Sequence, residues 1–198
     1  LSNGPGDPSE NVEIIKEVKK LSESGLPIFA ICLGHQLMAL AHGFKTEKLK
    51  YGHHGANHPV KDLNTGRVYI STQNHNYVIC DDSIDRNIAK PWFINVNDQT
   101  IEGVEYIGKN IKTVQFHPEA CAGPLDTDAL FDEFEKMMEE EDKKSKNKNN
   151  MHSKMISSLC FCFVTTNIQT NLFLANISHL FFRESLFLVQ IRFSMFRI

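Results

Sequence analysis

The first residues of the chain carry a helical pattern of apolar positions. Residues 7–10 combine an aspartate suited to capping, a proline at the first helical position and a glutamate three residues after the cap. One apolar face then follows, up to a terminating glycine at position 25, and it consists of Ile14, Val18 and Leu21. The pattern predicts a helix over about residues 8–24.

The segments that follow alternate between strand-like and helix-like patterns. Residues 27–31 are an apolar run typical of a short strand, and residues 34–42 are predicted as a second helix. Helix, strand and helix in succession are typical of an α/β fold with a parallel sheet. Shorter β-rich runs predict further strands at 68–71, 77–80, 92–96, 101–106 and 111–116.

A last helix is predicted over about residues 127–140. Its apolar residues fall on one stripe, which indicates core packing rather than a cofactor site; they are Leu130, Phe134, Met137 and Met138. The pattern therefore predicts one domain over residues 1–140. Residues 141–150 are rich in charge and asparagine, which predicts a solvated linker.

The remaining residues, 151–198, have a different character. They hold eight of the chain's 14 phenylalanines but no Gly, Pro or Asp, so turn signals are nearly absent. Their longest apolar run, 159–164, is far shorter than the roughly 18 residues that a membrane span needs. We leave this segment as an unassigned hydrophobic tail, either a non-native extension or a partner-binding appendage.

Charge and cysteine content narrow the class of protein. A formal net charge of −3 gives no basic surface for nucleic acid or an acidic membrane. The five cysteines form an odd, unpatterned set, which favours a reducing compartment over a disulfide scaffold. We expect a cytoplasmic protein, with a mitochondrial location as the alternative. The chain starts with neither an initiator methionine nor a targeting peptide, so its start is expected to be internal.

Cys32 is the strongest candidate for chemistry. It lies between the apolar run and the second predicted helix, in the order strand, tight turn and helix that is typical of a nucleophile elbow. The N-terminus of a helix favours a thiolate over a thiol. Far downstream, His117 and Glu119 follow a predicted strand and supply a base and a carboxylate to orient it. Together they predict a Cys-His-Glu triad.

An oxyanion formed at Cys32 needs backbone donors. The N–H of Leu33 is one candidate, and the Gly4-Pro5-Gly6 loop offers Gly4 or Gly6 as another. The same loop before a helix could instead hold a phosphate. Asp7 argues against that, because its carboxylate would repel the phosphate.

Several motifs together resemble one family, the class I glutamine amidotransferases, and within it the glutaminase domain of carbamoyl-phosphate synthetase small chains. The resemblance covers about residues 1–138. The Cys32 turn and His117-Pro118-Glu119 are shared across the class, whereas 50–60 and Gln73-Asn74-His75 resemble the carbamoyl-phosphate branch. It implies a partial, N-terminally truncated glutamine amidotransferase domain with a flavodoxin-like open sheet.

The resemblance also implies roles for residues around the triad. Gly4 would bind the oxyanion, and Gly6 and Gln36 would hold the α-amino acid end of glutamine. Asn74, Asn76 and Tyr77 would supply polar and backbone contacts to the substrate. The chain departs from the usual pattern at Asn76, where glycine is common; asparagine tolerates the left-handed backbone that a glycine there would suggest.

The implied reaction is hydrolysis of glutamine through a thioester, with ammonia passed to a carbamoyl-phosphate synthetase large chain or fused synthetase domain. That partner would use ATP and bicarbonate, and no cofactor is expected in this chain, which has no Walker-type loop. A chain that lacks the preceding strands is expected to be poorly stable and weakly active alone.

Alternatives remain open. Four histidines, His53, His54, His58 and His75, suggest a metal, but their spacing matches no standard ligand pattern and no acidic residue neighbours the first three, so we expect none. Another class I amidotransferase, such as anthranilate synthase component II, is the alternative enzyme, against which residues 52–60 argue. A non-catalytic docking module and an inactive fragment are the other possibilities.

Overall fold

A computed structural model of the chain describes residues 1–120 and 126–147. The predicted tail over 151–198 and the end of the predicted linker, 148–150, lie outside the described residues. None of the described helices is long and apolar enough to cross a lipid bilayer.

Six strands form one sheet in the described part of the chain. They are β1 (Ile28–Ile31), β2 (Thr46–Asp62), β3 (Val68–Ile79), β4 (Ala89–Asn95), β5 (Ile101–Tyr106) and β6 (Ile111–Val114). Their order is β1-β6-β5-β3-β2-β4, and β4 also pairs with β5, so the last four strands pair in a ring. Among these pairings only β1 with β6 is parallel.

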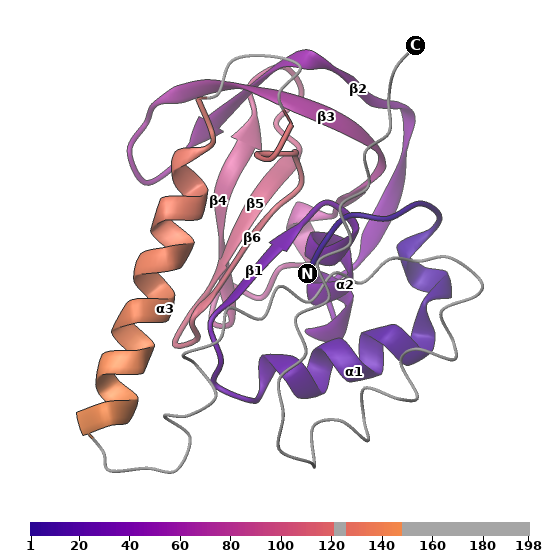
Figure 1. Cartoon of the computed structure of the whole chain (residues 1–198). Coiled ribbons are helices and arrows are strands. Elements are labelled where there is room, and N and C mark those ends of the chain that lie inside the picture. Colours follow the sequence, from indigo (N-terminus) through magenta and orange to yellow (C-terminus); the bar gives the residue numbers. More distant parts are fainter. Residues whose placement is uncertain (121–125, 148–198) are drawn as a thin grey trace, which may run out of the picture.

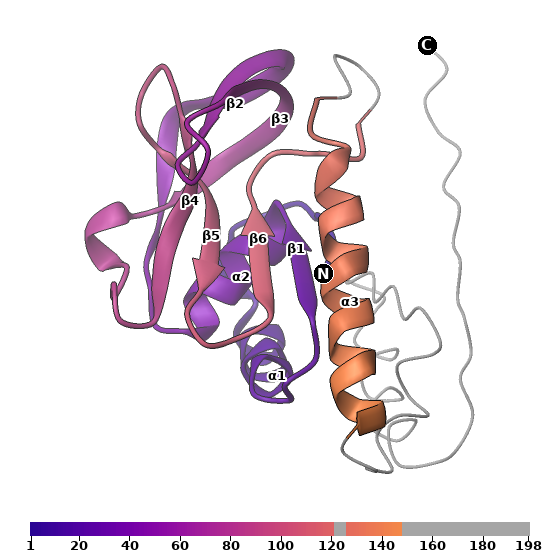
Figure 2. The ribbon, with the colours of Figure 1, turned by 90° about the vertical axis from the view of Figure 1, so that its left-hand side faces the viewer.

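Within residues 1–120 and 126–147, three α-helices cover the sheet: α1 (Val12–Ser22), α2 (Leu33–Ala41) and α3 (Ala129–Asn147). Short 3-10 turns precede α1 and β4, at η1 (Pro8–Glu10) and η2 (Asp81–Ser83). Figure 2 shows α3 on one side of β1 and the pair α1 and α2 on the other. Neighbouring residues of β1 pack on opposite faces: Ile28 joins the cluster with α1 and α2, and Phe29 joins the one with α3. The result is an α/β fold with two apolar layers.

The first predicted helix is split. Residues Pro8–Glu10 form a 3-10 turn capped by Asp7, whose carboxylate accepts from the backbone N–H of Ser9 at 2.9 Å. Asn11 then leaves helical geometry, with φ −89° and ψ 47°, and its side chain donates to the Asp7 carbonyl. The α-helix therefore begins only at Val12.

Strand β2 was not predicted, and β3 is one strand where two were expected. Figure 1 shows the two as a long hairpin above the other strands. β2 is buried only at His53, Val60 and Asp62, and its pairing with β3 has two register shifts. The strand therefore lacks the apolar alternation that identifies strands in a sequence.

The last helix is longer than predicted. It runs to Asn147 and so includes the first seven residues of the segment predicted as a linker. Opposite charges one turn apart support this extension, with Lys143 paired to Glu139 and Lys144 to Glu141, both at 3.5 Å.

Candidate active site

The two halves of the predicted triad leave the sheet at the same edge. Ile31 ends β1 directly beside Val114, which ends β6, and the two strands are parallel. Residues that follow parallel neighbours emerge together at the carboxyl end of the sheet. Cys32 comes directly after β1, and His117 follows β6 by three residues, so the fold itself brings them together.

Cys32 has the geometry of a nucleophile elbow. Its φ of 54° and ψ of −107° place it outside both β1 and α2, which begins at Leu33. A non-glycine residue in such a conformation costs about 1–3 kcal/mol and must be held by its surroundings. Here the Cys32 N–H donates to the Val114 carbonyl at 2.8 Å, which ties the turn to β6. The predicted order of strand, turn and helix is confirmed.

His117 is linked to both other members of the predicted triad. Its Nδ1–H donates to Glu119 Oε1 at 2.8 Å, which leaves Nε2 for the sulfur. Burial lowers the pKa of His117, but hydrogen bonds with Cys32 and Glu119 outweigh it and raise that pKa to about 10. The ring is therefore an imidazolium at neutral pH.

The glycine loop is anchored beside Cys32 at its start. The Leu1 amino group donates to the Phe29 carbonyl at 2.8 Å, and the Ile31 N–H donates to the Leu1 carbonyl at 2.9 Å. Leu1 therefore pairs with β1 in the manner of a parallel strand. It also lies on the first turn of α2, since a Cβ added to Gly34 would be 2.8 Å from the Leu1 oxygen.

The far end of the loop reaches the predicted substrate strand. Gly6 has a left-handed φ of 98°, and the next residue, Asp7, shares a hydrogen bond with the side chain of Tyr77 on β3. Partial burial and the Asp7 carboxylate both raise the pKa of the Tyr77 hydroxyl. The hydroxyl thus stays protonated and donates to Asp7, so loop and strand are joined.

Gln36 joins the same strand to the nucleophile helix. It is buried, one turn after Cys32, and its Nε2 donates to the Tyr77 carbonyl and to Gln115 Oε1, each at 2.9 Å. Gln36 was expected to hold the α-amino acid end of glutamine. In this structure its amide nitrogen holds Tyr77 and Gln115, and its role toward the substrate stays a prediction.

Asn74 and Asn76 lie on the exposed face of β3. Their side-chain oxygens contact the two ring nitrogens of His54, at 2.9 Å and 3.2 Å respectively. Asn76 is not among the residues with positive φ. The expectation of a left-handed backbone there was wrong, because Asn76 is part of the continuous strand β3, in which the backbone is extended.

Two features were missed from sequence. Gln115 is fully buried beside Gln36, and its only signal was a glutamine within an apolar run. His53 was judged to have no acidic neighbour, yet the fold places Glu102 and Asp98 on its two ring nitrogens, at 3.1 Å and 2.8 Å. Both contacts span more than 40 residues, so sequence adjacency could not reveal them.

The fold and this site define a class: α/β proteins with a cysteine at a nucleophile elbow, linked to a histidine and a glutamate. A family model described as glutamine amidotransferase class-I matches residues 1–137. The chain belongs to this family.

Curated proteins that resemble this chain in sequence are named carbamoyl phosphate synthase small chain. The carbamoyl phosphate synthase small chain of Helicobacter hepaticus is 54% identical over 137 residues, which are 69% of this chain and 36% of that protein. The small chain of Bacillus caldolyticus is 49% identical over 144 residues, 73% of this chain and 39% of that protein. The chain thus spans little more than a third of the length of these relatives.

Solved structures agree on the fold. A Thermoplasma acidophilum protein described as a GMP synthase subunit superposes with a TM-score of 0.62 at 22% identity, covering 74% of this chain and 75% of that one. A glutamine amidotransferase from Thermotoga maritima gives a TM-score of 0.51 at 15% identity, covering 78% and 70%.

Proposed function

We propose that this chain carries the glutaminase site of a carbamoyl phosphate synthase small chain. Family membership supports a glutamine amidotransferase, and relatives at about half identity are named carbamoyl phosphate synthase small chain. The observation that carries the proposal is the hydrogen-bonded linkage of Cys32, His117 and Glu119 at the end of β1 and β6.

The chemistry follows from the charge state of this triad. The Cys32 sulfur attacks the γ-carboxamide carbon of glutamine, and the carbonyl oxygen becomes an oxyanion. When the C–N bond breaks, His117 gives its proton to the leaving ammonia. Water then attacks the thioester while His117 takes a proton, and glutamate leaves with the thiolate restored. Glu119 keeps the imidazole oriented through Nδ1.

The oxyanion would be stabilised by backbone donors. The N–H of Leu33 stands at the start of α2, where the first N–H groups of a helix have no intrahelical acceptor. A second donor would come from Gly4, whose loop is fixed at Leu1 and at Asp7. Gly6, Gln36, Asn74, Asn76 and Tyr77 would then surround the glutamine.

The ammonia would serve a partner. We propose that it passes to a carbamoyl-phosphate synthetase large chain or fused synthetase domain, where ATP and bicarbonate are used. No cofactor is proposed for this chain, and no nucleic-acid or membrane partner. The odd number of unpatterned cysteines supports a cytoplasmic location.

The test is labelling of the full chain with a chloroketone analogue of glutamine, followed by mass spectrometry of the modified residue. We expect saturable labelling of Cys32 that glutamine prevents, and none in Cys32→Ala. Cys80→Ala is the matched control, because Cys80 is the other described cysteine and its pKa is raised by burial and nearby acidic groups.

Failure to label Cys32, or labelling that glutamine does not slow, would favour a docking module without catalysis. Glutamate release with and without a synthetase large chain then tests the coupling. Release that rises when the large chain is added supports the proposed partner.

A further inference from the structure

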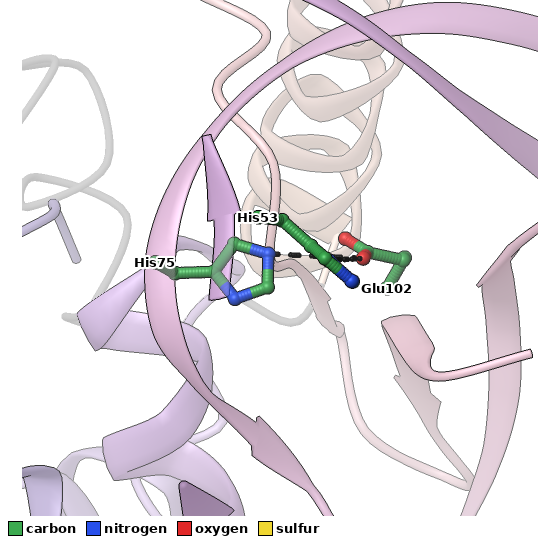
Figure 3. A group of neighbouring side chains, drawn as sticks. All are labelled: His53, His75 and Glu102. Carbon is green, nitrogen blue, oxygen red and sulfur yellow. Dashed lines mark hydrogen bonds and ion pairs between the residues drawn. The ribbon is translucent and has the colours of Figure 1, made fainter. Parts of the chain in front are cut away.

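A second cluster of polar side chains lies under the predicted substrate strand. Figure 3 shows His53 from β2, His75 from β3 and Glu102 from β5 turned toward one another. Their exposed fractions are 8%, 4% and 0%. A carboxylate shut off from water in this way needs a positive partner and hydrogen-bond donors.

His53 supplies that partner. Its Nδ1 lies 3.1 Å from Glu102 Oε1, and its Nε2 lies 2.8 Å from Asp98 Oδ2. Ionised carboxylates only accept hydrogen bonds, so both ring nitrogens must donate and the ring is an imidazolium. The hydrogen bond to Glu102 outweighs burial and, with the one to Asp98, raises the pKa of His53 to about 9.

A metal ion is the alternative occupant, because one ligand atom each from His53, His75 and Glu102 lie within 4.8 Å of one another. A metal would need a free lone pair on the ring nitrogen that faces Glu102. The two carboxylates that flank His53 hold a proton there instead. The proton on His53 therefore makes the cluster a buried ion pair through Glu102 Oε1, while Glu102 Oε2 has no hydrogen-bond partner among the described residues.

The cluster is connected to the candidate active site through His75. The Nε2 of His75 lies 3.7 Å from Glu102 Oε1, and its ring stands edge-on to His53 with centroids 4.8 Å apart. Its Nδ1 donates to the Tyr77 carbonyl at 3.0 Å. The same carbonyl accepts from Gln36, which lies one turn after Cys32. The carbonyl of Tyr77 is thus fixed from both sides.

The backbone next to His53 is in direct contact with the same strand. Gly52 has a left-handed φ of 69°, and a Cβ there would lie 2.5 Å from Asn76 Oδ1 and 2.8 Å from the His75 carbonyl oxygen. β2 and β3 therefore leave no room for a side chain at position 52. His53 is paired with His75 across the two strands, so a shift of His53 is expected to disturb residue 75 and the adjacent Asn76.

We propose that His53 and Glu102, closed on the outside by Asp98, are positioning residues for glutamine binding. They fix residues 74–77 against α2 without touching the substrate, so their loss weakens glutamine affinity and leaves the reactivity of Cys32 intact. This inference rests on the proposed glutaminase function.

The experiment separates affinity from reactivity. For Glu102→Gln in the full chain, the rate of Cys32 labelling is measured over a range of chloroketone concentrations. The curve gives the maximal rate and KI, the chloroketone concentration at half of that rate. Labelling by iodoacetamide, which has no amino acid part, reports the reactivity of Cys32 alone. We expect KI to rise about tenfold or more, with both rates within about twofold of the parent chain.

Glu105→Gln is the matched control. Glu105 lies on the same strand β5 and is paired with Lys90 and Lys112, away from His53. Its replacement also removes a partly buried carboxylate, but KI should stay within about twofold of the parent value.

A pH profile distinguishes this role from a general loss of structure. The groups that face His53 are Glu102, Asp98, His75, His58 and the amide of Asn95. In the parent chain His53 keeps its proton, so KI should be level between about pH 6 and 8. In Glu102→Gln its strongest partner is gone, the ring titrates in that range, and KI should rise with pH.

Asp98→Asn provides a second variant if Glu102→Gln does not fold. The Asp98 side chain is 43% exposed, so its replacement disturbs the core less. It should raise KI in the same direction by a smaller factor. An unchanged KI in either folded variant would overturn the proposal.

The remaining outcomes are also decisive. A parent chain whose Cys32 is never labelled saturably contradicts the glutaminase function itself, whereas saturable labelling with unchanged variants contradicts only the positioning role. If the purified protein holds one equivalent of bound zinc that Glu102→Gln loses and Glu105→Gln keeps, the cluster is a metal site and not a protonated ion pair.

Discussion

Cys32 and His117 are each anchored by a backbone hydrogen bond, in addition to the hydrogen bond between their side chains. The N–H of Cys32 is held by Val114 and that of His117 by Thr72, at 2.8 Å and 2.9 Å. Both acceptors belong to strands, β6 and β3, so the sheet fixes the backbone at the two reacting residues. The carboxylate of Glu119 then orients the imidazole and, together with Cys32, raises the pKa of His117.

Replacing Glu119 with glutamine tests that last step. One of the hydrogen bonds that raise the pKa of His117 loses its charge, so the pKa should fall from about 10 toward the ordinary value of 6.5. The maximal rate of chloroketone labelling should fall about 10–100-fold, while KI stays within about twofold. Glu13→Gln, at an exposed ion pair on α1, is the control. An unchanged rate would show that Glu119 does not act on His117.

Among the helices and strands, the sequence predicted those that a local pattern of residues marks. The apolar run and turn around Cys32 and the strand at 101–106 were predicted with nearly the bounds observed. Strand β2 was missed because its polar residues are stabilised by contacts with distant strands, such as His53 with Glu102. Candidate triad residues were visible as motifs, whereas Gln115 and Asp98 gain their roles only from packing.

The contact between the glycine loop and α2 gives a prediction at this level. Gly34→Ala would normally stabilise a helix by about 1 kcal/mol. Here the new methyl group would meet the Leu1 carbonyl at 2.8 Å and push the start of the loop from β1. We expect a net loss of about 1–3 kcal/mol in the free energy of unfolding and slower chloroketone labelling.

Chemical denaturation and the labelling rate check this prediction. Lys16→Ala, at an exposed position of α1, is the control and should change stability by less than about 0.5 kcal/mol. If Gly34→Ala is more stable than the parent chain, Leu1 does not pack on α2 as described.

The described residues form two apolar clusters and include three histidines, buried or half-buried, that differ in charge state. One cluster lies between the sheet and helices α1 and α2, and the other lies under α3. His35 is fully buried in the first region, and burial lowers its pKa to about 3. His53 and His117 instead have pKa values raised to about 9 and about 10.

These shifts predict a maximum in stability near neutral pH. A histidine whose pKa is raised in the folded state contributes its full stabilisation of the fold below pH 6.5, the pKa in the unfolded chain. That contribution is lost as the pH rises through about 9 for His53 and about 10 for His117. For His35 the sign is opposite: its stabilisation is present above 6.5 and is lost as pH falls toward about 3. The free energy of unfolding should therefore decline on both sides of neutrality.

Urea denaturation of the full chain between about pH 5 and 9.5 measures this curve. The alkaline decline should amount to about 1 kcal/mol or more, after allowance for screening by solvent. It should become shallower in His117→Asn, which removes one of the two groups responsible, and shallower again when His53→Asn is added. The acid decline should persist in both variants because His35 is unchanged. A parent curve that is level up to pH 9.5 would contradict the charged states assigned to His53 and His117.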